Sequence, residues 1–223
     1  MNTIKQQEEA LFAKWKGAQT NWVKDGAVNP EAYAISNPKV LYILKEANGG
    51  KEKQWAGGDL RDLLNKPTRW QTWNNVARWQ YAIAHLEKSI DWKEVDYISK
   101  SKRTELLNNI SVINLKKVPG SKQSNMNEIK SFAQKDIAFI KAQIAIYKPN
   151  IVICGGTGNI VKELKIMGSF SKWNTSKRGI EYCNLNQTII LNFKHPGVYS
   201  AKKKLFWDVV HTLREVQQKE AVL

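Results

Sequence analysis

The chain segment from 190 to 210, ILNFKHPGVYSAKKKLFWDVV, combines a histidine on a rigid turn with concentrated positive charge. A strand-like run ends in His195-Pro196-Gly197, and three lysines at positions 202 to 204 open the helix that follows. This pattern places one imidazole at the carboxyl edge of a sheet, beside charges that attract phosphate. Such a combination indicates catalysis on a polyanion.

Three other segments place polar groups or glycines directly after a strand-like run. KVLYILKEANGG supplies Glu46 and Asn48, INLKKVPGS supplies Asn114, and IVICGGTG supplies a glycine turn at 155–158. In open α/β sheets, ligands bind outside the carboxyl ends of the strands. We therefore expect a carboxylate, carboxamides, a glycine turn and the imidazole of His195 to meet in one site.

Strands alternate with helices along the chain, and this order predicts the sheet that positions those groups. We predict a three-layer α/β/α sandwich with a central, mostly parallel four-stranded sheet. The predicted strands span 39–45, 110–115, 151–154 and 188–193, with 180–183 as the partner or lead-in of the last. The predicted helices span 4–16, 59–64, 70–87, 92–108, 125–147, 158–167 and 201–219. The whole chain, 1–223, reads as a single domain with an N-terminal helix within 3–17 and a tryptophan-rich helical insertion at 51–108.

The charge balance indicates a polyanionic partner. The chain has 35 Lys and Arg residues against 20 acidic ones, which gives a formal charge of +15 and a pI near 9.7. Apolar runs are far shorter than a bilayer span and the first residues do not resemble a signal peptide, so we expect a cytoplasmic protein that binds DNA and no membrane. Cys154 and Cys183 read as buried thiols, too few for an iron–sulfur cluster, and we expect no metal and no cofactor.

Taken in order, these segments resemble the signature motifs of the uracil-DNA glycosylase superfamily. KVLYILKEANGG stands where that family has its acid motif, and INLKKVPGS is similar to the strand whose Asn reads the flipped base. The run IKAQIAIYKPNIVICGGTG resembles the family's long helix and the strand after it, and HPGVYSAKK resembles its His-Pro-Ser loop. The resemblance covers about 39–213 and implies a monofunctional DNA glycosylase with the fold of that family, which we expect to act as a monomer.

The resemblance implies a role for each strand-end residue. Glu46 would stabilise the cationic sugar and orient water, and His195 would donate a hydrogen bond to the pyrimidine O2. Asn114 would pair with the extruded base, beside Asn48, and Trp55 would stack on it. Contacts with the DNA backbone would come from Lys116, Lys117, Ser121, Lys122, Gly155, Gly156, Thr157, Tyr199 at the wedge position, Ser200, Lys202, Lys203 and Lys204.

Three departures from the family pattern bear on the substrate. Glu46 replaces an Asp or Asn, and Gly197 replaces a Ser. Asn48 stands where uracil-specific members carry a Tyr that blocks substituents at C5 of the base. A small side chain there admits a 5-substituted pyrimidine, and the superfamily includes anti-phage glycosylases that remove glucosylated hydroxymethylcytosine. The candidate substrates are therefore uracil, in repair, and a modified cytosine, in phage defence.

Each of these residues also has a plainer interpretation. Glu46 could form a surface ion pair with the adjacent Lys45, His195 could be a structural histidine, and Asn114 could cap a turn at the end of its strand. The turn at 155–158 could simply join a strand to a helix, because it lacks the third glycine of a dinucleotide-binding motif. For the whole chain, the alternatives are a non-catalytic nucleic-acid-binding module and a nucleotide-binding α/β enzyme.

Overall fold

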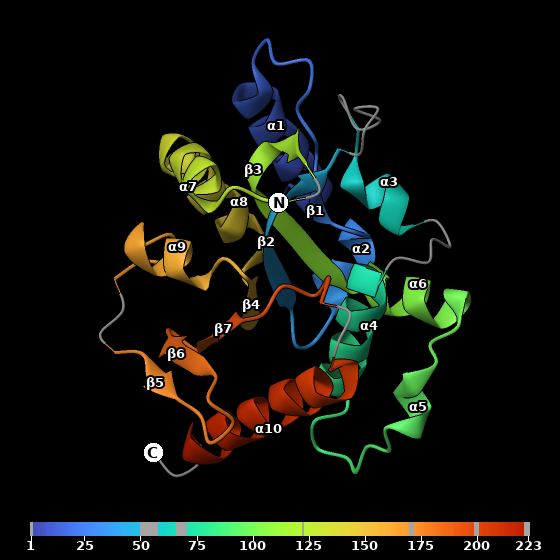
Figure 1. Cartoon of the computed structure of the whole chain (residues 1–223). Helices are drawn as coiled ribbons and strands as arrows, with labels where there is room; N and C mark the ends of the chain where they lie inside the picture. Colours follow the sequence, from blue (N-terminus) through green and yellow to red (C-terminus); the bar gives the residue numbers. More distant parts are fainter. Residues whose placement is uncertain are drawn as a thin grey trace.

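In the described part of the chain, the central sheet has seven strands in the order β1-β3-β2-β4-β7-β6-β5 (Figure 1). The computed structural model describes residues 2–49, 58–65, 71–121, 123–169, 172–198 and 201–220. Four neighbouring strands run parallel, namely β3 (Ile110–Gly120), β2 (Val40–Asn48), β4 (Ile151–Gly155) and β7 (Thr188–Phe193). Antiparallel strands flank them, β1 (Gly26–Ala27) beside β3, and β6 (Glu181–Leu185) followed by β5 (Asn174–Thr175) beside β7. The predicted α/β class is confirmed, whereas the predicted four strands are the parallel centre of a larger, mixed sheet.

The central strands are apolar on both sides because helices cover both faces of the sheet. In β2, Val40, Tyr42 and Leu44 face one hydrophobic core, while Leu41 and Ile43 face the other. All five side chains are buried. The continuous apolar runs of the sequence therefore correspond to strands packed between two helical layers.

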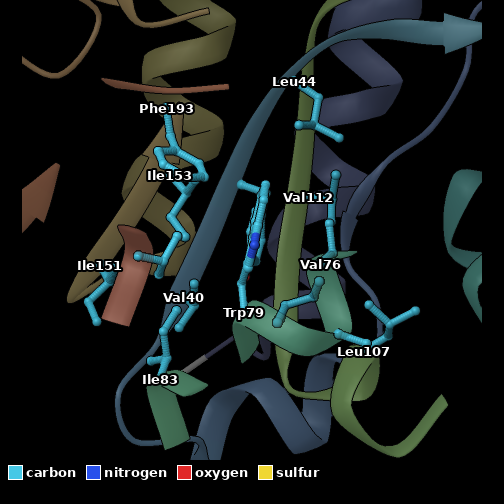
Figure 2. Close-up of a cluster of buried hydrophobic side chains, with 14 of the residues drawn as sticks. Val40, Leu44, Val76, Trp79, Ile83, Leu107, Val112, Ile151, Ile153 and Phe193 are labelled. Atoms are coloured by element: carbon cyan, nitrogen blue, oxygen red, sulfur yellow. The ribbon is translucent and has the colours of Figure 1, made fainter. Parts of the chain in front are cut away.

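The first core lies beneath four helices, α3 (Leu60–Leu64), α4 (Gln71–Ala84), α6 (Lys100–Asn108) and α10 (Lys202–Glu220). Figure 2 shows Trp79 of α4 at the centre of this cluster. Its ring stacks on that of Tyr42 at 6.4 Å and meets that of Phe193 edge to face at 5.1 Å. Large rings bury the most apolar area, so Trp79 anchors α4 to the sheet. Trp73 is buried as well, so both tryptophans of α4 are core residues.

The second core lies on the opposite face, beneath α1 (Ile4–Lys16), α2 (Pro30–Ile35), α7 (Met126–Lys135), α8 (Ile137–Tyr147) and α9 (Gly158–Glu163). Trp15 of α1 stacks on Phe139 of α8, with ring centroids 5.4 Å apart. Thr3 and Gln6 form a capping box that fixes the start of α1. The helix spans the same residues, 4–16, that the sequence predicts.

Two predicted helices are each divided into two shorter ones. The helix predicted at 125–147 is two helices, α7 and α8, which meet at Asp136. The helix predicted at 92–108 is also two, α5 (Lys93–Asp96) and α6, and the side chain of Ser99 caps the second. The residues Tyr97-Ile98-Ser99 weaken the helical pattern at the second break, whereas the apolar positions on either side of Asp136 do not reveal the first.

The strands that carry the predicted acid and carboxamide are longer than predicted. β2 continues through Asn48 and β3 through Gly120, because the two strands keep pairing, with one register shift, beyond their predicted ends. Lys116 and Lys117 therefore lie in a strand and not in a loop. The helix after β4, in contrast, is shorter than predicted and ends at Glu163.

The two cysteines are buried, free thiols, as predicted. Burial raises the pKa of both, that of Cys183 to about 11, so both stay protonated at neutral pH. No helix in the described residues is long and apolar enough to cross a membrane.

Candidate active site

The carboxyl ends of the four parallel strands meet at one edge of the sheet, which we call the carboxyl edge. In the order β3-β2-β4-β7, this edge presents Asn114, then Glu46, then the turn that follows Gly155, then His195. The topology thus brings together the four motifs that are far apart in the sequence.

The ring of His195 is held by its own loop. Its Nδ1 accepts a hydrogen bond from the backbone N–H of Gly197 at 3.0 Å. A neutral imidazole that accepts at Nδ1 carries its proton on Nε2, which is then a donor. Burial, and after it the charge of Lys45, lowers the pKa of His195 to about 4. At neutral pH the ring is therefore uncharged, with one N–H donor in a fixed orientation.

A buried asparagine on α4 holds the loop at 194–198, which carries His195 and which we call the histidine loop. Nδ2 of Asn75 donates to the backbone oxygens of Pro196 at 2.7 Å and Val198 at 3.2 Å. Its Oδ1 accepts from Nη1 of Arg78 at 3.0 Å, and Nε of Arg78 donates to the Val95 backbone oxygen at 2.8 Å. Sequence reasoning missed this clamp. The one signal was the place of Asn75 and Arg78 among apolar helix residues, where a polar side chain requires a partner.

The carboxylate of Glu46 is buried and paired with a lysine. Its Oε2 lies 2.8 Å from Nζ of Lys116, which also lies 2.7 Å from Oε1 of Glu128, and the Glu46 side chain is 4% exposed. A Cβ on Gly120 would come within 1.9 Å of the Glu46 carboxyl carbon, so a side chain at this position would displace the carboxylate. No hydrogen bond from the described residues reaches Oε1 of Glu46, so this oxygen is left for water or a ligand.

Lys116 therefore forms an ion pair with Glu46 and does not bind a phosphate. Burial lowers its pKa, but hydrogen bonds with Glu128 and Glu46 outweigh burial, so the pKa of Lys116 lies above its ordinary value. The ammonium stays charged between two carboxylates, and Lys116 is not the phosphate ligand that the sequence predicts. The alternative interpretation, a surface ion pair between Glu46 and Lys45, is also wrong. Glu46 forms a buried ion pair instead, and its cation is Lys116 of β3.

The carboxamide of Asn114 has no hydrogen-bond partner within the described part of the chain. The residue is 3% exposed, and its backbone N–H donates to Oδ2 of Asp25 at 2.8 Å. Its partner on β2 is Leu44, two residues before Glu46. Because β3 continues past Asn114 and the side chain caps no turn, the capping interpretation is wrong. The carboxamide keeps both a donor and an acceptor for another group.

Lys117 points away from Lys116, because neighbouring residues of a strand face opposite sides. Its Nζ lies 2.6 Å from Oδ1 of Asp25 and 2.9 Å from Oε1 of Gln143, and its side chain is 2% exposed. The predicted phosphate contact of Lys117 is therefore wrong, since the ammonium is enclosed in the protein. The same Asp25 binds the backbone of Asn114, so this buried network fixes the strand that carries the carboxamide.

The glycine turn after β4 brings Lys45 next to His195. Gly156 has a φ of +73°, and a Cβ there would lie 3.0 Å from Cε of Lys45 and 3.4 Å from Cβ of His195. The hydroxyl of Thr157 is buried and donates to the Ile43 backbone oxygen at 2.7 Å, so Thr157 is not the predicted phosphate ligand. The helix that follows, α9, has six residues. The turn packs two side chains together instead of presenting a long helix to a phosphate.

The three lysines at the start of α10 differ in their partners. Nζ of Lys202 lies 2.5 Å from a carboxylate oxygen of Asp96, and Nζ of Lys204 lies 2.6 Å from one of Asp208. Lys203 is exposed, and no carboxylate among the described residues pairs with it. Because α10 begins shortly after the histidine loop, these lysines border the carboxyl edge.

The other predicted contacts are distributed around the edge. Ser121 is exposed beyond β3, and its hydroxyl donates to the Gln123 backbone oxygen at 2.8 Å. Asn48 is exposed at the end of β2. Gly155 is buried inside the sheet, where it pairs with Phe193 of β7, so its predicted contact with DNA is wrong. The predictions for Trp55, Lys122, Tyr199 and Ser200 lie outside the described residues.

The carboxyl edge offers a neutral donor at His195, a paired carboxylate at Glu46 and an ammonium at Lys45, a set suited to electrostatic and acid–base catalysis. Within the described ranges, no three His, Cys, Asp or Glu side chains gather as a metal site would require. No protein-family model matches this chain, and no curated protein shows significant sequence similarity to it. A function therefore has to follow from the geometry of these side chains.

Proposed function

We propose that this protein is a monofunctional DNA glycosylase of the uracil-DNA glycosylase superfamily, which flips a pyrimidine out of DNA and hydrolyses its bond to deoxyribose. The state of His195 is the observation that carries the proposal. Its ring is neutral, oriented by the Gly197 N–H, and placed at the same sheet edge as the Glu46 carboxylate. One donor and one anion are what the two halves of a breaking glycosidic bond require.

In the proposed reaction, the bond between C1′ of the sugar and N1 of the base breaks, and its electron pair leaves with the base. Glu46 stabilises the oxocarbenium ion of the sugar, and Nε2 of His195 donates to O2 of the departing anion. A water molecule then attacks C1′ and gives a proton to Glu46, while the base anion takes up a proton from solvent. A neutral imidazole suffices as the donor, so a pKa of about 4 suits His195.

Both reacting groups are held by partners that a substrate does not have to displace. Lys116 fixes Oε2 of Glu46 and leaves Oε1 toward the sugar, and Asn75 fixes the loop of His195. Groups that are already oriented need no rearrangement when charge develops in the transition state, so they stabilise it more.

The charge of the chain supports DNA as the partner. The proposed glycosylase acts as a monomer in the cytoplasm. The formal charge is +15, and Lys203, which pairs with no carboxylate among the described residues, borders the carboxyl edge. The base is a 5-modified cytosine, such as glucosylated hydroxymethylcytosine in phage DNA, or uracil. The exposed Asn48 supports the 5-modified cytosine, because a carboxamide closes less space beside C5 of the base than an aromatic ring would.

Base release from synthetic DNA tests this function. Single- and double-stranded oligonucleotides that carry uracil, 5-hydroxymethylcytosine or its glucosylated form are incubated with the protein, and alkali then cleaves any abasic site. We expect cleavage with at least one base, and His195→Ala and Glu46→Gln should each lower the single-turnover rate about a hundredfold. His85→Ala is the matched control and should keep the wild-type rate, because this histidine stacks on Tyr81 near the far end of α4.

Two results would overturn the proposal. Tight DNA binding without any abasic product would indicate a non-catalytic binding module. Thermal stabilisation by a nucleotide, again without base release, would indicate a nucleotide-binding enzyme. The second result is disfavoured by the glycine turn, where the Thr157 hydroxyl is already bonded inside the protein.

A further inference from the structure

Lys45 is a second charged side chain at the carboxyl edge, next to His195. Its Cε lies 3.0 Å from the position that a Cβ would take on Gly156, and Cβ of His195 lies 3.4 Å from that same position. The two side chains therefore flank one glycine. The φ of +73° at Gly156 favours glycine for a separate reason, so the backbone itself keeps the space between Lys45 and His195 free of a side chain.

The ammonium of Lys45 has no anionic partner of its own. Within the described part of the chain, no carboxylate forms a salt bridge with it, and its residue is partly buried. Its charge acts on the imidazole, since it contributes, after burial, to the lowered pKa of His195. A cation that no carboxylate neutralises attracts an anion, so this position suits a ligand that supplies negative charge.

Lys45 and Glu46 place opposite charges on the two sides of one strand. The two side chains have different neighbours along the carboxyl edge, because Glu46 lies against Gly120 of β3 and Lys45 lies against Gly156 after β4. A breaking glycosidic bond has the same polarity, with positive charge on the sugar and negative charge on the base. If the carboxylate side receives the sugar, the Lys45 side receives the base.

We infer that Lys45 is a second catalytic donor, whose ammonium stabilises the departing base as an anion together with Nε2 of His195. This inference rests on the proposed function, because it assigns a role in the same reaction. The lysine transfers no proton. The electron pair of the C1′–N1 bond passes to the base, its charge collects on N1 and O2, and the ammonium lies against that charge.

A second donor suits a base that is a poor leaving group. The cytosine anion spreads its charge over one carbonyl oxygen and the uracil anion over two, so the cytosine anion is the more basic. Stabilisation of the anion therefore accelerates cytosine release more than uracil release. The substrate class that follows is a pyrimidine of the cytosine type, with the 5-substituent that Asn48 leaves room for.

The test compares leaving groups in variants of Lys45. Lys45→Met removes the charge and keeps the length of the side chain, and Lys45→Arg keeps the charge. Single-turnover release is measured on DNA that carries 5-hydroxymethylcytosine, 5-fluorocytosine, uracil or 5-fluorouracil. We expect Lys45→Met to lose about a hundredfold on 5-hydroxymethylcytosine but no more than about tenfold on 5-fluorouracil, whereas Lys45→Arg stays within about threefold of wild type. Lys194→Met, which removes an exposed lysine beside His195 in the sequence, is the matched control and should keep all four rates.

The outcomes distinguish this inference from the proposed function. If the wild type releases base but Lys45→Met loses the same factor on every base, or loses only affinity for DNA, the ammonium binds a phosphate and the inference is overturned alone. If the wild type releases no base from these DNAs or from glucosylated DNA, the proposed function fails and the inference fails with it. NMR titration of His195 gives a reading independent of activity: its pKa should rise in Lys45→Met, and an unchanged pKa would contradict the placement of Lys45.

Discussion

At His195, burial and the charge of Lys45 both favour the uncharged ring, and the stability of the fold should therefore depend on pH. The folded pKa of about 4 lies below the ordinary value of 6.5. Between these two values the unfolded chain binds more protons than the folded chain does. The free energy of unfolding therefore includes a contribution that is complete above pH 6.5 and is lost as the pH falls toward 4.

We predict that His195→Asn weakens this acid dependence. Asn keeps an acceptor near the position of Nδ1 but does not titrate, so the variant should lose less stability on acidification. The wild type should lose about 2 kcal/mol more than the variant between pH 7 and pH 4.5, measured by urea unfolding. Equal losses in the two proteins would show that the fold does not hold this ring neutral.

Asn48 makes a second prediction at the scale of a single residue. Asn48→Tyr should lose release of a 5-substituted cytosine by steric exclusion and retain any release of uracil, which has only hydrogen at C5. A ring forced against a hydroxymethyl or sugar group costs a few kcal/mol, enough for at least about tenfold discrimination. The measurement is the ratio of release rates for the two bases. Asn48→Ser is the control, and a ratio that Asn48→Tyr leaves unchanged would place this residue outside the pocket.

At the scale of elements, the sequence predicts a strand well where burial defines it and poorly where pairing does. The apolar runs at 151–154 and 188–193 match β4 and β7, since both are buried between helical layers. β3 is different, because KKVPGS has the composition of a loop, yet its pairing with β2 extends the strand to Gly120. That extension alone decides that Lys116 and Lys117 face opposite sides of a sheet.

The candidate site shows the same division. The residue types of Glu46, Asn114 and His195 could be chosen from the sequence, because each follows a strand and parallel strands end at one edge. Their partners could not be chosen. The pairing of Glu46 with Lys116 depends on strand register, and the clamp of Asn75 depends on where α4 packs, and no local pattern encodes either.

The buried network beneath β3 carries the prediction for this scale. Lys117→Met should destabilise the fold by about 3–5 kcal/mol, because it leaves the carboxylate of Asp25 buried without a cation. Urea unfolding measures the loss. Lys102→Met, which breaks an exposed pair with Glu105, is the control and should cost less than about 1 kcal/mol. A Lys117→Met protein that keeps its stability but binds DNA more weakly would show that Lys117 contacts DNA.

At the scale of the whole molecule, the excess positive charge should make DNA binding steeply dependent on salt. Replacing Lys202, Lys203 and Lys204 together by Ala should flatten the slope of log K against log[salt] by about 0.9 to 2.7, or about 0.9 per phosphate contact. The lower value applies if Lys203 acts alone, since the other two already pair with carboxylates. An unchanged slope would show that this cluster faces away from DNA.

The matched control removes the same charge from the opposite end of the sheet. Lys39 precedes β2, Lys88 lies beyond α4, and Lys148 caps the C-terminal end of α8. Replacing these three lysines by Ala lowers the net charge equally and should leave the slope nearly unchanged. Equal flattening in both triple variants would mean that total charge, and not one face of the molecule, governs the binding.

The contact between Asn75 and Pro196 joins residues 121 positions apart, so α4 and the histidine loop form one structural unit. The stretch at 51–108 reads as an insertion that evolution could shorten or discard. Its helix α4 nevertheless holds the histidine loop and fills the core with Trp79. A chimera that received the loop without α4 would inherit the imidazole and lose its orientation. Loop and helix must therefore be inherited, or transplanted, together.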